Sequence, residues 1–272
     1  MRKLKFALVL CFVFTLSGVQ AQVLKNGHAH NDYWHAKPLI QAMDAGFMSV
    51  EVDVHLLKGD ILVNHEAIFT RKGRNLEKLY LQPLFEMAKA NQFKSVYADG
   101  PEEFIVYLDV KQGCPGIHDT LITQLKSYQQ MLTVWEDGVK KIGAVSVIIG
   151  DCGRREEWVS AEKRWFYFDA HLDAIDNSLD ADFIPRVSSN LRAVTKWRGA
   201  GEMPLEDEEK IREIVEQAHA KGRTVRFWAG SNRPKVWDKL LDLGVDWINV
   251  DRLKKFQRFM KKRQERIASL KD

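Results

Sequence analysis

Two carboxylates lie two residues apart in the segment Ser-Val-Glu-Val-Asp-Val, at Glu51 and Asp53. On an extended strand both side chains point to the same side. In an enclosed site they would repel each other and lose solvation unless a proton or a cation neutralised them. Asp109 ends another apolar segment and can supply a third carboxylate at the same end. Three such oxygens favour Mg²⁺ or Ca²⁺, whereas an exposed pair on an edge strand would need no ion.

Two histidines accompany these acids. His28 follows the first apolar segment, and His65 follows a predicted hairpin. With a two-residue turn at 58–59, Asp53 faces Asn64, and the chain returns His65 to the acidic segment. Two histidines beside a cation suit acid–base cleavage of a phosphodiester. One takes a proton from the attacking hydroxyl, and the other gives a proton to the leaving oxygen.

Short apolar segments alternate with amphipathic ones along the chain. We expect eight strands, at 23–27, 49–53, 104–109, 144–149, 165–169, 184–188, 224–228 and 247–250. Helical patterns lie between them, at 38–45, 76–90, 117–135, 205–220 and 234–243. This alternation predicts an α/β fold, a (β/α)8 TIM barrel forming a single domain over residues 22–272. A doubly wound open sheet is the alternative, but no Gly-x-Gly-x-x-Gly motif follows the first strand.

These segments resemble the glycerophosphodiester phosphodiesterase and phosphatidylinositol-specific phospholipase C-like superfamily, in a little-characterised branch. The resemblance rests on Gly-His-Ala-His-Asn at 27–31, Ser-Val-Glu-Val-Asp-Val at 49–54, Leu-Val-Asn-His-Glu at 62–66, Tyr-Leu-Asp-Val-Lys at 107–111, Arg-Phe-Trp at 226–228 and Leu-Gly-Val-Asp-Trp-Ile-Asn-Val-Asp at 243–251. The opening motif is also similar to the sphingomyelinase D-like branch. The resemblance implies a metal-dependent TIM-barrel hydrolase of a glycerophosphodiester or a phospholipid head group.

By position, the resemblance implies roles for particular residues. The ligands of one Mg²⁺ or Ca²⁺ ion would be Glu51, Asp53 and Asp109, the acid–base pair His28 and His65, and the substrate contacts His30, Asn31, Lys111 and Trp228. The superfamily usually has His-Arg-Gly after its first strand, whereas Ala29 and His30 follow His28 here. His30 therefore replaces the missing phosphate contact or is itself the catalytic histidine.

Two other functions compete with this one. His28 and His30 after the first strand, with Asp251 after the last, also match a metal-dependent amidohydrolase barrel. That class needs further histidines at the ends of strands five and six, and only His171 is available. The other candidate is a non-catalytic barrel that binds phosphorylated ligands.

The first 21 residues predict a secretory signal peptide. Cations at positions 2, 3 and 5 precede a short apolar run, and small residues at 19 and 21 mark a cleavage site. We therefore expect an exported protein, periplasmic or secreted. Without this segment 38 basic residues face 37 acidic ones, so no global basicity suggests a nucleic acid as partner.

The C-terminal segment is the most basic part of the chain. Residues 252–272 hold nine Lys or Arg and two acids, with apolar residues at helical spacing. We predict an amphipathic helix that packs on the barrel. Peripheral contact with an anionic membrane is a second interpretation. The basic run Arg71, Lys72 and Arg74 would lie on the catalytic face.

Two cysteines remain after the predicted cleavage, Cys114 and Cys152. They follow strands three and four by a few residues, so their loops begin as neighbours on one face. A disulfide and two free buried thiols are both compatible with this placement.

Overall fold

Eight parallel strands form a closed barrel in the computed structural model of the chain. The structure describes residues 22–98, 100, 103–114, 116–150, 152–153, 155–175 and 178–270, so the predicted signal peptide lies outside the described residues. In barrel order the strands are β1 (Leu24–Ala29), β2 (Phe47–Leu57), β4 (Phe104–Gln112), β7 (Val145–Gly150), β9 (Tyr167–His171), β10 (Arg186–Asn190), β11 (Thr224–Trp228) and β12 (Trp247–Val250). β1 pairs with both β2 and β12, which closes the ring. The predicted TIM barrel is confirmed, and each of its eight strands overlaps an expected one.

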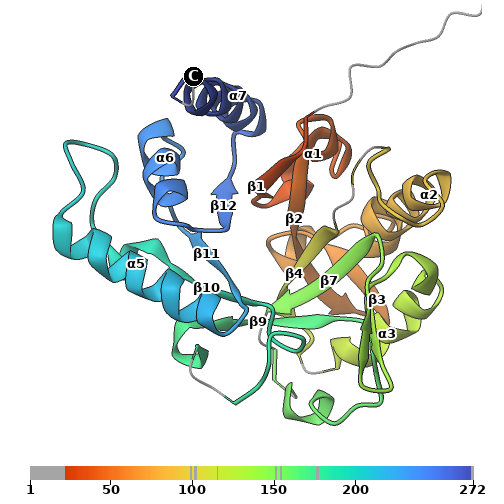
Figure 1. The fold of residues 1–272 in the computed structure, drawn as a ribbon. Helices are drawn as coiled ribbons and strands as arrows, with labels where there is room; N and C mark the ends of the chain where they lie inside the picture. Colours follow the sequence, from red (N-terminus) through yellow and green to blue (C-terminus); the bar gives the residue numbers. More distant parts are fainter. Residues whose placement is uncertain are drawn as a thin grey trace, which may run out of the picture.

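Helices surround the ring of strands (Figure 1). They are α1 (Ile40–Asp44), the π-helical η3 (Glu77–Leu81) that continues into α2 (Gln82–Ala90), α3 (Ile117–Lys126), α4 (Leu191–Val194), α5 (Leu205–Ala220), α6 (Pro234–Asp242) and α7 (Leu253–Ser269). In the described part of the crossovers after β7 and β9, short 3-10 turns stand in place of α-helices: η5 (Arg155–Trp158) and η6 (Leu172–Ala174). In the described residues, no helix is long and apolar enough to cross a membrane.

Alternate side chains along each strand point either into the lumen of the barrel or outward, toward the surrounding helices. Along β2, Val50, Val52 and Val54 point outward into the apolar layer beneath the helices. The intervening Glu51 and Asp53 therefore point into the barrel. Deeper in the lumen, Ile105, Tyr107, Ile148 and Tyr167 form a separate apolar cluster. The lumen is thus apolar at depth and acidic toward the carboxyl ends of the strands.

The predicted hairpin after β2 is confirmed in its register. β3 (Asp60–Val63) runs antiparallel to β2, with Leu57 opposite Asp60 and Val54 opposite Val63. Lys58 and Gly59 both have positive φ, 52° and 78°, as a tight two-residue hairpin turn requires. Asn64 N donates to Asp53 O at 3.2 Å. The hairpin therefore returns the chain to Asp53.

The helix expected at 117–135 is wrong beyond Lys126. After a 3-10 turn, η4 (Gln129–Met131), the chain enters a small antiparallel sheet of β5 (Val134–Glu136), β6 (Val139–Lys141) and β8 (Lys163–Arg164). Asp137 and Gly138 both have positive φ, the signature of a two-residue hairpin. This Asp-Gly turn was the signal that the helical interpretation overlooked.

The predicted C-terminal helix forms as α7 and packs on the barrel through its first half. The Phe256 side chain is fully buried, with its ring centroid 5.1 Å from that of Trp237. Arg263 and Arg266 form ion pairs with Asp238 of α6. Ile267 and Leu270 are exposed instead of buried as the apolar spacing predicted. Part of the basic character of α7 is therefore neutralised within the protein.

Cys114 and Cys152 form a disulfide that joins the loops after β4 and β7. Their Cα atoms are 5.5 Å apart, and 38 positions separate them in sequence. Of the two states compatible with the sequence, the structure contains the bridged one.

We expect the Cys114→Ser/Cys152→Ser variant to lose about 2–4 kcal/mol of unfolding free energy, because the bridge restricts the unfolded chain. Urea denaturation with and without reductant measures this. Reductant should destabilise the parent protein and leave the variant unchanged. A parent protein insensitive to reductant would contradict a stabilising bridge.

Candidate active site

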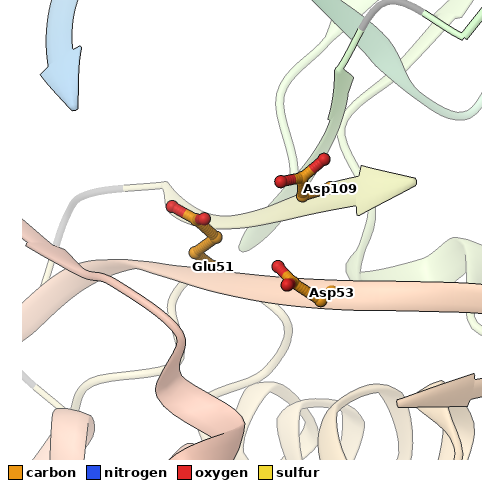
Figure 2. A group of neighbouring side chains, drawn as sticks. All are labelled: Glu51, Asp53 and Asp109. Atoms are coloured by element: carbon orange, nitrogen blue, oxygen red, sulfur yellow. The ribbon is translucent and has the colours of Figure 1, made fainter. Parts of the chain in front are cut away.

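The carboxylates of β2 and β4 meet inside the mouth of the barrel. Asp53 lies directly opposite Asp109 in the parallel pairing of the two strands. Glu51, Asp53 and Asp109 each offer an oxygen within 4.8 Å of the others, and Figure 2 shows the side chains pointing toward one another. The first two are buried, whereas 34% of the Asp109 side chain is exposed. The structure thus brings together the three predicted ligands.

The two oxygens of Asp53 differ in their polar contacts. Oδ2 accepts from the Tyr33 hydroxyl at 2.9 Å, lies 2.7 Å from His65 Nδ1 and is 3.3 Å from Lys111 Nζ. Oδ1 is buried and has no hydrogen-bond partner among the described residues. Burial raises the pKa of Asp53, since Lys111 offsets only part of the desolvation and two carboxylates lie nearby. An unpartnered carboxylate oxygen at the meeting point of three acids is suited to a hard divalent cation.

Glu51 has a separate counter-charge, Arg226 of β11. Arg226 Nη1 donates to Glu51 Oε2 at 2.6 Å, and both side chains are buried. Burial disfavours the ionised acid, but the guanidinium outweighs it and holds the pKa of Glu51 well below its usual range. Arg226 also lies over the Tyr107 ring, 4.4 Å from its centroid. This pairing keeps Glu51 ionised inside the barrel.

His28 has no exposed surface, and both of its ring nitrogens have partners. Nδ1 lies 2.7 Å from Ser49 Oγ, and Nε2 lies 3.0 Å from Glu51 Oε2. Arg226 Nη1 is 2.7 Å from the same Nε2. Burial, reinforced by the Arg226 cation, lowers the pKa of His28 to about 3. The ring is therefore neutral at neutral pH and fixed against Glu51.

His30 approaches Glu51 from a more exposed position. Its Nδ1 is 2.6 Å from Asp251 Oδ1, and its Nε2 is 3.8 Å from Glu51 Oε1. Asn232 donates to the Asp251 carboxylate and accepts the Asp251 backbone N–H at 3.0 Å. Burial opposes protonation, but the hydrogen bond to Asp251 and the charge of Glu51 raise the pKa of His30. About 30% of the His30 side chain is exposed.

His65 is oriented in the same way as His30. A carboxylate, that of Asp53, holds its Nδ1, and 42% of the side chain is exposed. The ring of Trp34 lies beside it, with centroids 5.6 Å apart. In both histidines a carboxylate orients one nitrogen and leaves Nε2 free of a close hydrogen-bond partner.

The other residues predicted to contact substrate are distributed around the mouth. Lys111 lies 2.7 Å from Asp109 Oδ2 and so links two of the acids. Asn31 is buried at φ 48°, where it starts the 3-10 turn η1 (Asp32–Trp34). Trp228 ends β11 and is 36% exposed.

Sequence reasoning assigned no role to Arg226 and did not predict the hydrogen bond from the Tyr33 hydroxyl to Asp53. Arg226 had a usable signal, because a cation in the middle of a short apolar strand must meet an acid if that strand is buried. No sequence signal indicated the contact of the Tyr33 hydroxyl with Asp53, because the conformation of the β1–α1 loop brings the two residues together. The link from Asn232 to Asp251 likewise depends on the tertiary fold.

The amidohydrolase pattern is only partly assembled. His30 and Asp251 do pair. His28, however, is turned toward Ser49 and Glu51, and β10 ends in Ser-Ser-Asn, without a histidine. Within the described residues, the group of three with metal-ligand spacing is the acidic trio.

The fold and the site define a TIM barrel with three carboxylates at its mouth. A crystal structure of glycerophosphodiester phosphodiesterase from Agrobacterium tumefaciens superposes with a TM-score of 0.51. It covers 88% of this chain and all of that one, and at 13% identity it establishes the fold alone. The AIM6-like phosphodiesterase domain matches residues 18–169, more than half of the sequence. The chain belongs to this family.

Relatives that match most of this chain support the assignment. Altered inheritance of mitochondria protein 6 of Eremothecium gossypii is 29% identical over 271 residues, covering 87% of this chain and 70% of that protein. The Arthroderma benhamiae homolog is 26% identical over 251 residues, covering 82% and 80%. The Saccharomyces cerevisiae protein is 23% identical over 270 residues, covering 83% and 68%.

Removal of the Arg226 charge should destabilise the fold. We expect Arg226→Gln to lose about 3–5 kcal/mol in chelator, because Glu51 becomes a buried, uncompensated charge. Chemical denaturation measures the loss. Lys235→Gln, which breaks the exposed pair with Glu202, is the control and should change stability little. Equal effects of both substitutions would contradict the role of Arg226.

Proposed function

We propose that this protein hydrolyses phosphodiesters with the help of one divalent cation, Mg²⁺ or Ca²⁺. The observation that carries the proposal is the convergence of Glu51, Asp53 and Asp109 at the barrel mouth, with His65 held on Asp53. Active sites of TIM barrels lie at this end. The glycerophosphodiester type of substrate and the phospholipid head-group type both fit this chemistry.

The residues present fit a divalent cation. Its ligands would be the three carboxylates, with Asp53 Oδ1 the buried oxygen that has no protein partner. When bound, such an ion polarises the phosphoryl group and stabilises the charge that develops on it. Lys111 Nζ lies between Asp53 and Asp109 and is close enough to contribute a cationic contact to a phosphate at the mouth.

Acid–base catalysis by a pair of histidines requires that each ring has a free nitrogen facing the substrate. His65 meets this requirement, because Asp53 holds its Nδ1 and leaves Nε2 at the mouth. For the second group, the contacts favour His30 over His28. His30 is oriented by Asp251 and partly exposed, whereas His28 is enclosed with both nitrogens engaged.

In this assignment one of His30 and His65 removes the proton of the attacking hydroxyl. The other gives a proton to the leaving oxygen. Attack by water and attack by a neighbouring hydroxyl of the substrate, which first gives a cyclic phosphate, both use this pair. His28 acts as a positioning residue, because it holds Glu51 beside Arg226.

We expect Asp53→Asn to remove both cation binding and turnover, since it discards the charge at the centre of the trio. Thermal unfolding with Mg²⁺, Ca²⁺ or chelator should show a cation-dependent rise in Tm for the parent protein and none for the variant. Asp44→Asn, on the outer helix α1, should behave as the parent protein does. If neither the Tm nor the turnover of the parent protein depends on added cation, the metal site is refuted. Cation binding without turnover on a panel of phosphodiesters would favour the non-catalytic barrel.

The histidine assignment predicts different losses at three positions. His30→Asn and His65→Asn should each lower kcat by about 10²–10⁴-fold with the cation still bound. His28→Asn should mainly lower Tm and cation affinity, because it removes support from Glu51. His219→Asn is the control, since this histidine also holds a carboxylate, that of Asp246, at 2.8 Å. A folded, cation-bound but inactive His28→Asn beside a near-normal His30→Asn would restore His28 as the catalytic residue.

A further inference from the structure

Large apolar side chains are exposed beside the catalytic histidine His65. Trp34 is 64% exposed, and Ile68 and Phe69 are 84% and 61% exposed. Ile68 and Phe69 lie in the 3-10 turn η2 (Ala67–Phe69), which begins two residues after His65. We call Trp34, Ile68 and Phe69 the apolar tip.

Contacts among the loops hold this tip in place. The Trp34 ring lies 5.6 Å from that of His65. Asn64 Nδ2 donates to Phe69 O at 3.1 Å, which closes the turn. Arg74 Nη2 donates to Tyr33 O at 2.9 Å and so joins the two loops. The tip is therefore a structured projection whose apolar groups face solvent at a cost in free energy.

Basic residues flank the tip. Arg71 and Lys72 follow it and are exposed. A hollow of about 660 Å³ lies between α1 with the loop before it and the start of α7, and its lining includes His35, the residue after Trp34. Lys37, Arg252 and Lys254 line this hollow, and all three are exposed. Within the described residues, none of these five cations forms an ion pair with an acid.

We propose that the barrel mouth docks on a bilayer containing anionic phospholipid, with the apolar tip inserted among the lipids. Apolar side chains ringed by cations are the pattern of an interfacial anchor. This pattern lies around a site suited to a phosphate. One lipid surface would therefore both receive the apolar tip and present a phosphate head group to the site. Because it rests on the proposed function, the inference narrows the substrate to a membrane phosphodiester.

Further cations lie at the start of α7. Arg252 and Lys254 follow Asp251, the partner of His30, within three residues. In the body of α7, Arg263 and Arg266 form ion pairs with Asp242 and Asp238, whereas Arg258, Lys261 and Lys262 are exposed. Cations available to lipid therefore lie both beside the barrel mouth and along α7.

Vesicle sedimentation of the whole protein tests the proposal. The probes are phosphatidylcholine vesicles with and without phosphatidylserine, in chelator so that no turnover occurs. The parent protein should bind the anionic vesicles more tightly, and Ile68→Ser/Phe69→Ser should weaken this binding about tenfold or more. Val139→Ser/Ile142→Ser is the matched control. These residues are 57% and 68% exposed near the start of β7, at the opposite end of the barrel, and their loss should change nothing.

Charge reversal gives an independent measurement. Arg71→Glu/Lys72→Glu should weaken binding to anionic vesicles by roughly fivefold per cation and leave binding to neutral vesicles unchanged. Added salt should reduce the difference between the vesicles. Failure of the parent protein to bind either vesicle overturns the proposal, as does an equal loss in the control pair. If the tip binds a protein instead of lipid, the parent protein should bind neither vesicle.

Activity separates this inference from the proposed function. Hydrolysis of a soluble phosphodiester should be unchanged in Ile68→Ser/Phe69→Ser, while hydrolysis of the same group in a vesicle lipid should fall. Vesicle binding without any hydrolysis would refute the enzyme and support the docking surface. Hydrolysis of soluble substrates without vesicle binding would support the proposed enzyme and refute the docking surface.

Discussion

Like charges gathered inside a closed barrel must be neutralised, and this constraint organises the whole site. One oxygen each of Glu51, Asp53 and Asp109 lies within 4.8 Å of the others, and Glu51 and Asp53 are buried. Arg226 neutralises the first, and Lys111 bridges the other two. Desolvation of these groups would otherwise cost several kcal/mol each. The protein therefore supplies cations to an acidic lumen, while Asp53 Oδ1 has no hydrogen-bond partner among the described residues and is the oxygen assigned to the proposed ion.

The same constraint explains why three neighbouring histidines differ. His28 lies at the level of the Glu51–Arg226 pair, where a third charge would be expensive, so it is neutral and enclosed. His30 and His65 lie higher, where each meets a carboxylate and partial solvent. Two residues along the chain thus separate an enclosed histidine from one that is partly exposed and held by a carboxylate, as the proposed proton transfer requires. Chemical type alone does not distinguish such residues, but burial does.

Periodicity and turn chemistry made much of the fold predictable. The alternation of Glu51 and Asp53 with valines placed both acids inside, and the turn at 58–59 fixed the hairpin register that returns His65 to Asp53. The segment 117–135 misled because its apolar spacing continues past Lys126, where pairing with β7 and an Asp-Gly turn decide the structure. The partners of His28, the reach of Arg226 and the Tyr33–Asp53 bond join residues far apart in sequence. Local patterns can show that a buried cation needs an acid, but they do not specify which distant residue it meets.

The β2–β3 hairpin positions both the proposed acid–base residue His65 and the proposed docking tip. Because strand side chains alternate with a period of two, a one-residue slip in this hairpin would turn His65 away from Asp53. It would also displace the turn Ala67–Phe69, which begins two residues after His65 and is closed by Asn64. The positive φ angles of Lys58 and Gly59 hold the register against such a slip. One turn therefore positions His65 and the apolar tip together, so the proposed docking on lipid would present His65 to the surface in a fixed orientation.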